Sequence, residues 1–328
     1  MTASALKLVL RPPYNDGREA LLAKHLTTPW TVTPAQGPEA FAREIADADA
    51  VVSMAWSGPA PTAPKLRLLQ LPGAGLDLIE FSAVPPQTTV CNVFEHEIGI
   101  AEYCVLAILE SLIGLRGQDA RLRRGDWSDS LHGGAGTHGE LYGKTVGIVG
   151  YGRIGRETAK RLKPFGVRVV ACTRSPGKDD DGADAVASMD RLGWLLGEAD
   201  FVVVACPLDD DTRGLFDARA FAAMKPSAVL INVARGPVVD EDALYAACKA
   251  GRIGGAVIDV WWRYPKGKGE TLFPSIHPLH ELPNVILTPH TSGWSAGLHE
   301  RRWRVISQNL DRLSRGEPLL NLVRSPAA

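Results

Sequence analysis

The sequence is poor in cysteine, has no excess of charge of either sign and contains no long hydrophobic run. Its five cysteines are scattered and form no CxxC pair, which is typical of free thiols in a reducing compartment. The charges of the 36 basic and 37 acidic residues nearly cancel, which argues against non-specific electrostatic binding to nucleic acid or to an anionic membrane. No apolar stretch approaches the ~20 residues of a membrane span. We therefore expect a cytoplasmic protein without nucleic-acid or membrane partners.

Several common catalytic patterns are also absent. The chain has no nucleophile elbow around a serine and no phosphate-binding P-loop pattern. His277 and His280 are close in sequence, but no third metal ligand lies near them, and His132 and His138 stand in a glycine-rich stretch. We therefore expect no metal site.

The chain alternates short apolar runs with helical patterns, as α/β proteins do. With 328 residues, 45% of them hydrophobic and 22% charged, it is long enough for about two domains with a large buried core. In the first hundred residues we expect strands at 6–10, 50–53, 66–71 and 90–93, and helices at 17–25 and 39–48.

A second α/β series follows a polar, glycine-rich stretch at residues 116–139. Long helices are expected at 99–115, before this series, and at 297–313, after it, and the later helix would pack back on the first unit. The strands of the second series are expected at 145–149, 167–171, 201–205, 228–232, 256–260 and 285–288.

The strongest local motif is Gly150-Tyr151-Gly152-Arg153-Ile154-Gly155, between a predicted strand and a predicted helix. That setting is what a dinucleotide-binding turn requires, whereas the glycine spacing alone is weak evidence. The first glycine permits the tight turn, the second lets the backbone approach a pyrophosphate, and the third lets the helix pack closely on the strand. The helix N-terminus would then offer amide groups and a positive dipole end to the phosphates.

The end of the next predicted strand indicates which dinucleotide binds. An NAD site usually carries Asp or Glu about 20 residues after the glycines, where it accepts a hydrogen bond from the ribose 2′-hydroxyl. Here Thr173, Arg174 and Ser175 occupy that place. Arg174 can bind a 2′-phosphate through two parallel hydrogen bonds, so we predict NADP as the preferred cofactor, with NAD also possible. The alternative is that Arg174 is a surface arginine and that both cofactors bind.

Seven blocks of the chain carry a resemblance that is more specific than the glycine motif alone. They are residues 71–75 (LPGAG), 140–150 (ELYGKTVGIVG), 206–208 (CPL), 224–226 (MKP), 231–236 (INVARG), 255–260 (GAVIDV) and 288–290 (TPH). In this order, and over nearly the whole chain, they resemble the D-isomer-specific 2-hydroxyacid dehydrogenases, a family that includes glyoxylate/hydroxypyruvate reductases and phosphoglycerate dehydrogenase.

This resemblance implies an α/β fold of two Rossmann-like domains, each with a doubly wound parallel sheet. A dinucleotide-binding domain at residues 99–291 would be inserted into a flavodoxin-like substrate domain made of residues 1–98 and 292–328, with the active site in the cleft. The resemblance also implies a homodimer built largely by the cofactor domain. The implied activity is hydride transfer between NAD(P) and a small 2-keto acid or D-2-hydroxyacid.

Reduction of a 2-keto acid needs groups that hold the carboxylate, polarise the carbonyl and supply a proton. Arg235 follows a predicted strand, where open α/β sheets place ligands, and its guanidinium suits a carboxylate and a carbonyl oxygen. His290 also follows a strand, and an ordinary pKa of about 6.5 suits a general acid in reduction or a base in oxidation. By resemblance these two residues are the family's catalytic arginine and histidine.

The resemblance also implies contacts with the substrate and the cofactor. Backbone amides of the small residues Gly73, Ala74 and Gly75 would hold the substrate carboxylate, because glycines allow close approach; the alternative is an ordinary turn. The implied cofactor contacts are Gly150, Gly152, Arg153, Ile154, Gly155, Thr173, Arg174, Ser175, Cys206, Pro207, Ala234 and Asp259.

One position departs from the family pattern. Five residues after Asp259 the family has a glutamate before a proline, and here Tyr264 takes its place. In the family that glutamate pairs with the catalytic histidine and favours its charged form. A phenol can hydrogen-bond the imidazole but brings no charge at pH 7. We therefore predict that Tyr264 acts with His290, that the histidine pKa is lower by ~1 unit or more, and that reduction has a more acidic optimum.

Other residues leave alternatives open. Trp261, Trp262 and Trp294 lie near the predicted strand ends, and we predict that Trp294 contacts the substrate, although large aromatic residues more commonly pack in a core or an interface. His96 or Glu97, just before the helix at 99–115, is a second candidate for the missing acid.

The sequence therefore predicts an enzyme that reduces a small 2-keto acid such as glyoxylate or hydroxypyruvate with NADPH. A pocket bordered by tryptophan would favour a bulkier acid. A dehydrogenase of another small anion, such as formate or phosphite, fits the same carboxylate-binding pattern. A regulator that senses the dinucleotide and acts through partners is favoured by Tyr264, whereas Arg235 and His290 favour the enzyme.

Overall fold

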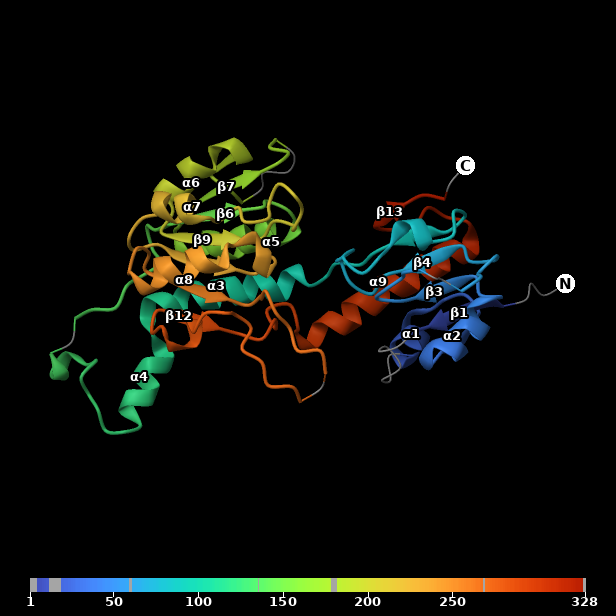
Figure 1. Ribbon diagram of the computed structural model, residues 1–328, viewed down its shortest axis with the longest axis horizontal. Coiled ribbons are helices and arrows are strands. Elements are labelled where there is room, and N and C mark those ends of the chain that lie inside the picture. Colours follow the sequence, from blue (N-terminus) through green and yellow to red (C-terminus); the bar gives the residue numbers. More distant parts are fainter. Residues whose placement is uncertain are drawn as a thin grey trace. The chain divides into compact units, whose positions relative to one another are not determined.

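The chain folds into two compact units, each with its own sheet (Figure 1). Unit 1 combines Met1–Glu95 with Ala296–Ala328, and unit 2 is the segment His96–Ser295. Unit 2 is thus inserted into the sequence of unit 1. The computed structural model describes residues 5–11, 19–58, 61–134, 136–177, 182–267 and 269–326.

Unit 1 is built on a six-stranded sheet with the order β2-β1-β3-β4-β5-β13. The first five strands run parallel in the doubly wound 2-1-3-4-5 order of flavodoxin-like domains. Strand β13 pairs antiparallel with β5 at one edge. The flavodoxin-like sheet that we predicted is therefore confirmed. The strands are β1 (Leu6–Leu10), β2 (Trp30–Pro34), β3 (Ala50–Val52), β4 (Leu68–Gln70), β5 (Thr89–Cys91) and β13 (Leu322–Arg324).

The apolar run of β1 shows why helices cover both faces of this sheet. Val9 packs in a cluster with Phe41 of α2, whereas Leu8 and Leu10 pack in another with residues of α1 and α9. Successive side chains of a strand point to opposite faces, so a continuous apolar run needs a helix layer on each side. The helices are α1 (Glu19–His25), α2 (Gly37–Ile45) and α9 (Ala296–Arg315), with a 3-10 turn at η1 (Phe81–Ala83).

Unit 2 is built on a seven-stranded parallel sheet with the order β12-β11-β10-β9-β6-β7-β8. This is the doubly wound order of dinucleotide-binding domains, with β6 as the first strand, and it reverses direction between β6 and β9. Ligands of such sheets bind beyond the carboxyl ends of the strands at that reversal. The strands are β6 (Thr145–Val149), β7 (Arg168–Thr173), β8 (Ala185–Ser188), β9 (Phe201–Val204), β10 (Val229–Asn232), β11 (Gly255–Ile258) and β12 (Val285–Leu287).

Two helix layers bury the faces of this second sheet. Leu195 of α6, Phe221 of α7 and Leu244 of α8 belong to one core cluster, and Ile108 of α3 and Leu162 of α5 belong to the other. The helices are α3 (Glu97–Ile113), α4 (Leu115–Leu122), α5 (Arg153–Leu162), α6 (Leu192–Glu198), α7 (Ala218–Ala223) and α8 (Glu241–Lys249). Short 3-10 turns lie at η2 (Leu131–Gly133), η3 (Lys163–Phe165), η4 (Met189–Arg191), η5 (Gly236–Val238) and η6 (Leu279–Glu281).

Every strand that we predicted from an apolar run is present, with ends shifted by a few residues. Three strands were missed: β2, β8 and β13 are short or half-buried edge strands, whose sequences lack a continuous apolar run. The predicted helix at 99–115 ends earlier, because Gly114 adopts a left-handed φ of +66° and terminates α3. Residues 17 and 18 of the first predicted helix lie outside the described residues.

Within the described ranges, no single helix is long and apolar enough to cross a membrane. The bent pair α3 and α4 meets that length and composition test only when the two helices are taken together.

Asp311 of α9 ties the loop after α1 to the core of unit 1. The residue is 5% exposed, and its carboxylate accepts hydrogen bonds from the backbone N–H groups of Thr27 and Thr28, at 3.1 and 2.9 Å. Both threonine hydroxyls donate to it as well, each at 2.6 Å. Such a charged acceptor contributes more to the stability of the fold than a neutral acceptor does, because its loss leaves several donors unsatisfied.

We expect Asp311→Ala to lower the free energy of unfolding by about 2–4 kcal/mol, since it removes a buried charged acceptor and leaves these partly buried donors without a partner. Denaturant titration followed by circular dichroism measures the change. The matched control is Asp210→Ala, which removes an exposed aspartate and should change stability by no more than about 0.5 kcal/mol. Equal effects of the two substitutions would contradict the role of Asp311.

Candidate functional site

The carboxyl ends of the parallel strands of unit 2 carry most of the residues that the sequence singled out. Arg174 follows β7 and Cys206 follows β9, on either side of the glycine turn after β6. Arg235 follows β10, Asp259 follows β11 and His290 follows β12. Parallel strands all end at the same edge of a sheet, so one rim of unit 2 holds these residues.

Three glycines shape the turn between β6 and α5. Gly150 has a φ of +95°, and a Cβ there would lie 2.4 Å from the backbone N of Cys206. A Cβ at Gly155 would lie 2.7 Å from the carbonyl oxygen of Gly150. At Gly152, in contrast, a Cβ would meet nothing within 4 Å. Packing therefore requires the first and third glycines, whereas the second faces open space, as the close approach of a ligand would need.

The N-terminus of α5 and a neighbouring cavity fit parts of a dinucleotide. Gly152 is the N-cap, and no side chain caps this helix end, so none competes with an anion for the first-turn amides. The cavity measures about 160 Å³, less than the ~300 Å³ of a typical small-molecule site, so it would hold only part of the ligand. It is lined by Gly150, Tyr151, Gly152, Thr173, Arg174, Met189, Ala205, Cys206, Pro207 and Thr212.

Six residues predicted for the cofactor do not line this cavity: Arg153, Ile154, Gly155, Ser175, Ala234 and Asp259. Arg153 begins α5, and its Nη1 lies 3.7 Å from Oε1 of Glu97. Ile154 packs, half-buried, against the core beneath α3 and α5. Ser175 is exposed beyond β7, and Ala234 is buried after β10. Contact between these residues and a cofactor stays a prediction.

Arg174 has a carboxylate partner that the sequence analysis did not foresee. Its Nη1 donates to Oδ2 of Asp209 at 2.8 Å. The two residues are 35 positions apart, so no local pattern in the sequence joins them. The arginine side chain is 56% exposed and the aspartate 33%, so the pair remains accessible at the rim of the cavity.

The second group of residues is organised around His290. Nδ1 of its ring lies 2.9 Å from the hydroxyl oxygen of Tyr264. The same hydroxyl accepts a hydrogen bond of 3.1 Å from the backbone N–H of Trp261. Tyr264 therefore stands at the place where we expected a partner for the imidazole.

The Tyr264 hydroxyl can pair with either protonation state of the Nδ1 atom of His290. The Trp261 N–H uses one of the two acceptor sites of the hydroxyl oxygen, so the hydroxyl can donate its proton to a neutral Nδ1 or accept the Nδ1–H of the charged ring at its second site. In the charged ring, and in the neutral ring whose Nδ1 accepts, the Nε2–H group is the one that His290 offers to a ligand.

The pKa of His290 is lowered from its ordinary value. Although the side chain is exposed on one side, loss of water on the other is the main cause; the Asp259 carboxylate opposes the shift and the positive charge of Arg235 adds to it. Burial raises the pKa of Tyr264, against the effects of its backbone donor and Arg235. The charge of Arg235 thus acts on both rings, and these three side chains form one electrostatic cluster.

A buried carboxylate holds the loop that carries His290. Asp259 is 0% exposed; its Oδ1 accepts from Oγ1 of Thr288 at 2.5 Å and from N of Thr291 at 2.9 Å, and its Oδ2 accepts from N of Ser292 at 2.9 Å. Within this loop His290 has a φ of +60°, which costs a non-glycine residue ~1 kcal/mol or more. The three hydrogen bonds offset that cost. A cofactor contact of Asp259 stays a prediction.

Close packing at a glycine positions Arg235. A Cβ at Gly236 would lie 2.3 Å from the backbone C and O atoms of Trp261, so only glycine lets this turn approach the segment after β11. The buried side chain of Asn232 donates to the carbonyl oxygen of Arg235 at 3.2 Å. The sequence analysis missed this role of Asn232, although the residue stands three positions before Arg235 in the block Asn-Val-Ala-Arg-Gly.

The small-residue loop of unit 1 has its carbonyl groups engaged by the protein. The carbonyl oxygen of Gly73 accepts from N of Val93 at 3.2 Å, and that of Ala74 accepts from Nδ2 of Asn92 at 3.1 Å. In a trans peptide the N–H points opposite to the C=O. The N–H groups of Ala74 and Gly75 therefore point away from these partners, an orientation suited to a carboxylate ligand.

Two of the tryptophans are built into the rim of unit 2. The indole N–H groups of Trp261 and Trp262 donate, at 2.9 Å each, to the carbonyl oxygens of Thr288 and Val239. These hydrogen bonds are what we expect of tryptophans that pack as part of the fold, which is the alternative to substrate contact given in the sequence analysis. Trp294 is 62% exposed, and its contact with substrate stays a prediction.

The place beside Nδ1 of His290 is taken by Tyr264 and not by His96 or Glu97. Oε2 of Glu97 lies 3.8 Å from Nδ1 of His96, and its Oε1 lies 3.7 Å from Nη1 of Arg153. These distances connect Glu97 with the start of α5 rather than with the imidazole of His290.

The histidine pair that we considered for a metal has other neighbours. Nε2 of His277 lies 2.6 Å from Oδ1 of Asp242, and its ring stacks on Tyr245. The ring of His280 stacks on Phe273. In the part of the chain that the structure describes, no group of three or more His, Cys, Asp or Glu side chains is arranged to hold a metal ion.

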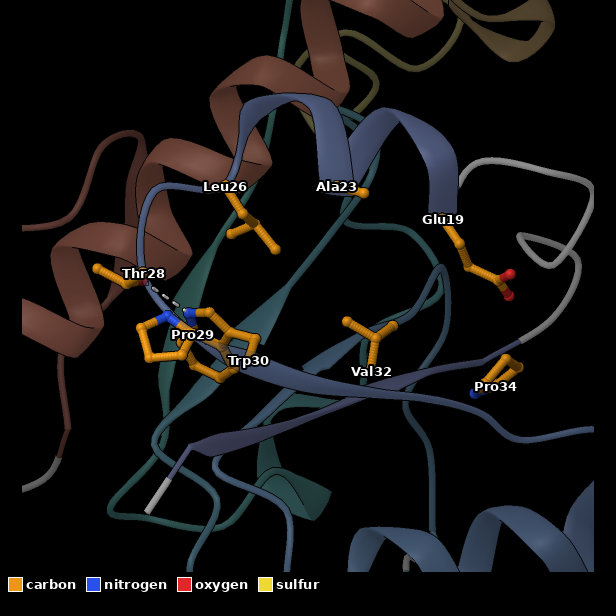
Figure 2. Close-up of a pocket in the computed structure, with 8 residues that line it drawn as sticks. All are labelled: Glu19, Ala23, Leu26, Thr28, Pro29, Trp30, Val32 and Pro34. Atoms are coloured by element: carbon orange, nitrogen blue, oxygen red, sulfur yellow. Dashed lines mark hydrogen bonds between the residues drawn. The ribbon is translucent and has the colours of Figure 1, made fainter. Parts of the chain in front are cut away.

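A separate cavity of about 490 Å³ lies in unit 1 between α1 and β2 (Figure 2). Its lining is mainly apolar, with the carboxylate of Glu19 at one end and the indole of Trp30 at the other. That indole donates to Oγ1 of Thr28 at 3.1 Å. None of the residues that the sequence singled out lines this cavity, so we do not include it in the candidate site.

Comparison with known proteins gives one consistent family. A family model described as "D-isomer specific 2-hydroxyacid dehydrogenase, NAD binding domain" matches residues 105–292. A glyoxylate reductase of Thermococcus gammatolerans is 32% identical over 293 residues, which cover 85% of this chain and 84% of that protein. A D-3-phosphoglycerate dehydrogenase of Methanocaldococcus jannaschii is 32% identical over 88% of this chain, which spans 54% of that relative's length.

Solved structures agree with the sequence comparison. The crystal structure of a D-isomer specific 2-hydroxyacid dehydrogenase from Xanthobacter autotrophicus, in complex with NADPH and MES, matches with a TM-score of 0.76. The match covers 98% of each chain at 27% identity.

We expect Tyr264→Glu to raise the pKa of His290. A carboxylate in place of the phenol stabilises the charged imidazole, and the rise should be ~1 unit or more. Titration of the histidine ring protons by NMR measures it, with the His277 resonance as an internal reference, because that ring already lies beside Asp242. Tyr264→Phe removes the hydroxyl without adding charge and should give no comparable rise. An unchanged pKa in the glutamate variant would contradict this account.

Proposed function

The chain belongs to the D-isomer-specific 2-hydroxyacid dehydrogenase family, an oxidoreductase family, and from this premise we propose that it reduces a small 2-keto acid to the D-2-hydroxyacid with NADPH. The observation that carries the proposal is the cluster of Arg235, Tyr264 and His290 on the same rim of unit 2 as the glycine turn. The same rim therefore carries Arg235, a cation that can bind a carboxylate, His290, a proton donor, and a glycine turn that fits a pyrophosphate.

Each residue of the cluster has a distinct task in the proposed reaction. The bound nicotinamide would supply the hydride. Arg235 would bind the substrate carboxylate and polarise the keto oxygen, because its fork of donors matches both. His290 would donate the Nε2 proton to that oxygen as negative charge develops there, a step worth about 10²–10⁴ in rate. Tyr264 would accept the Nδ1–H of the charged ring and so keep the ring in place.

We propose that the two domains, each with its own sheet, bind different ligands. Residues 99–291 would bind the dinucleotide, and residues 1–98 with 292–328 would bind substrate. The outward N–H groups of Ala74 and Gly75 support a carboxylate site in the latter. The exposed Trp294 is our candidate for a further substrate contact.

Two observations support NADPH over NADH. Arg174 lines the cavity at the glycine turn, and a guanidinium is the group that binds a 2′-phosphate best. The related Xanthobacter enzyme has NADPH bound. Glyoxylate and hydroxypyruvate are the first substrates to test, because one of the relatives at 32% identity is a glyoxylate reductase.

The lowered pKa of His290 sets the expected pH dependence. The protonated ring is the donor in reduction, and its fraction falls as pH rises through the pKa. Because that pKa is lowered, the rate of reduction should fall at a lower pH than an ordinary histidine would give. Tyr264→Glu should move this fall to higher pH, in step with the pKa change expected in the NMR titration.

Tyr264 also favours a second candidate function, a dinucleotide-sensing regulator without turnover. The phenol brings no charge to stabilise the protonated histidine, so a role in which the ring no longer transfers a proton is consistent with it. Dehydrogenation of another small anion is a third candidate, since Arg235 would bind such an anion equally well. Substrate turnover separates these functions.

The first experiment is to follow oxidation of NADPH and NADH with glyoxylate, hydroxypyruvate, pyruvate and phenylpyruvate at several pH values. We expect turnover with NADPH, and a loss of about 10²–10⁴ in kcat in His290→Ala, as for removal of a general acid. His277→Ala alters a histidine whose ring contacts Asp242 and Tyr245, outside the cluster, and should leave the rate within about twofold. Tight NADPH binding without turnover of any acid would favour the sensing role.

We also propose that the chain forms a homodimer through the segment after α3. In Figure 1 this segment, α4 and the residues that follow, extends from the sheet of unit 2. It exposes Leu122, Trp127 and Leu131 at 51, 61 and 91%, and several large apolar side chains exposed on one short segment favour an interaction surface.

Light scattering should give about twice the monomer mass of 35.2 kDa. Leu131→Glu should shift the protein toward the monomer, because a charge at the centre of an apolar interface is costly. The matched control is Phe273→Glu, at a residue that is 60% exposed elsewhere in unit 2, and it should leave the mass unchanged. A wild-type monomer at micromolar concentration would contradict the proposal.

A further inference from the structure

The ion pair at the rim of the cavity brings together two strand ends that flank the glycine turn. Arg174 comes directly after β7 and Asp209 comes after β9, and both strands pair with β6. The Arg174 Nη1 to Asp209 Oδ2 distance is 2.8 Å. The arginine proposed for the 2′-phosphate of NADP therefore already has an anionic partner.

Asp209 is held in place by the turn that follows it. Its Oδ1 accepts from the backbone N of Thr212 at 3.2 Å and lies 3.0 Å from the hydroxyl of that residue. Thr212 is itself 4% exposed, and its hydroxyl lies 2.7 Å from the carbonyl oxygen of Pro207. One carboxylate oxygen is thus bound to a buried anchor, and the other faces Arg174.

The carboxylate is charged at neutral pH. Partial burial works against ionisation, but hydrogen bonds from Thr212 and the charge of Arg174 outweigh it and lower the pKa of Asp209. The neighbouring Asp210 and Asp211 are exposed. A 2′-phosphate at Arg174 would therefore meet a fixed negative charge, which no other residue singled out for this cavity supplies.

We propose that Asp209 reduces the preference for NADPH over NADH, by competing with a 2′-phosphate for Arg174 and by offering an acceptor to a ribose 2′-hydroxyl. This inference rests on the proposed role of unit 2 in binding the dinucleotide. A carboxylate near the ribose is the group by which NAD sites recognise the 2′-hydroxyl and repel the 2′-phosphate. In this chain the acid comes from the end of β9 instead of the end of β7.

The exposure of the pair determines how strong the effect is. An ion pair between side chains that are 56 and 33% exposed is weak and screened by salt. Arg174 can therefore leave Asp209 for a phosphate at little cost, and the aspartate weakens the preference for NADPH without reversing it. We expect the wild-type protein to bind both cofactors, with only a modest preference for NADPH.

Binding of two small probes tests this inference apart from catalysis. Adenosine 2′,5′-bisphosphate and adenosine 5′-monophosphate differ only in the 2′-phosphate, and calorimetry on the full chain gives the Kd of each. The specificity ratio is the Kd of the monophosphate divided by that of the bisphosphate. Asp209→Asn keeps an oxygen for Thr212 and removes the charge that faces Arg174. It should raise the ratio roughly three- to tenfold at low salt.

The matched control is Asp210→Asn, which removes the same charge from the next, exposed position and should raise the ratio by less than twofold. A double-mutant cycle with Arg174→Gln isolates the competition between Asp209 and the 2′-phosphate for the arginine. Without Arg174, the increase in the specificity ratio caused by Asp209→Asn should be smaller. The full cofactors NADPH and NADH, titrated by fluorescence, should follow the same ranking as the probes.

The outcomes separate the two proposals. A ratio that rises in Asp209→Asn, and rises less without Arg174, supports the inference. Equal ratios in the Asp209 and Asp210 variants overturn it, while leaving dinucleotide binding by the wild-type protein intact. If the wild-type protein binds neither probe nor either full cofactor, the proposed function fails as well. Thermal unfolding of each variant checks that the fold is retained.

Discussion

The site depends on a single buried charge, the carboxylate of Asp259. A carboxylate with no exposure is costly unless donors surround it, and here the loop after β12 supplies three: Thr288, Thr291 and Ser292. The loop must therefore adopt the one course that brings these donors to β11. That course carries His290 through a left-handed backbone conformation.

Close backbone packing makes the neighbouring groups depend on the same region. The segment after β11 donates the Trp261 N–H to Tyr264, and the same residue leaves no room for a side chain at Gly236, next to Arg235. A shift of this segment would move the phenol, the arginine and the histidine together. The three groups thus form one unit, in which their relative geometry is preserved even though they lie far apart in sequence.

Sequence patterns predicted what depends on local chemistry and missed what depends on long-range pairing. The apolar runs gave the buried strands, and the glycine spacing located the turn at Gly150. Edge strands such as β8 have no such run, because only part of their surface is buried. The pairing of Arg174 with Asp209 was missed for a different reason: the parallel order of β7, β6 and β9 makes these strand ends neighbours, and no local motif encodes that order.

Tyr264 changes what the histidine can do, and not only how strongly it holds a proton. A glutamate could only accept from Nδ1, so it would favour the charged ring at every step. The phenol can donate to a neutral Nδ1 or accept from a protonated one, and the contact of 2.9 Å serves both states. Because the phenol adds no negative charge, this contact does not offset the loss of water that lowers the pKa of His290. Transfer of the Nε2 proton from the charged ring would leave the remaining ring proton on Nδ1, where the phenol oxygen can accept it.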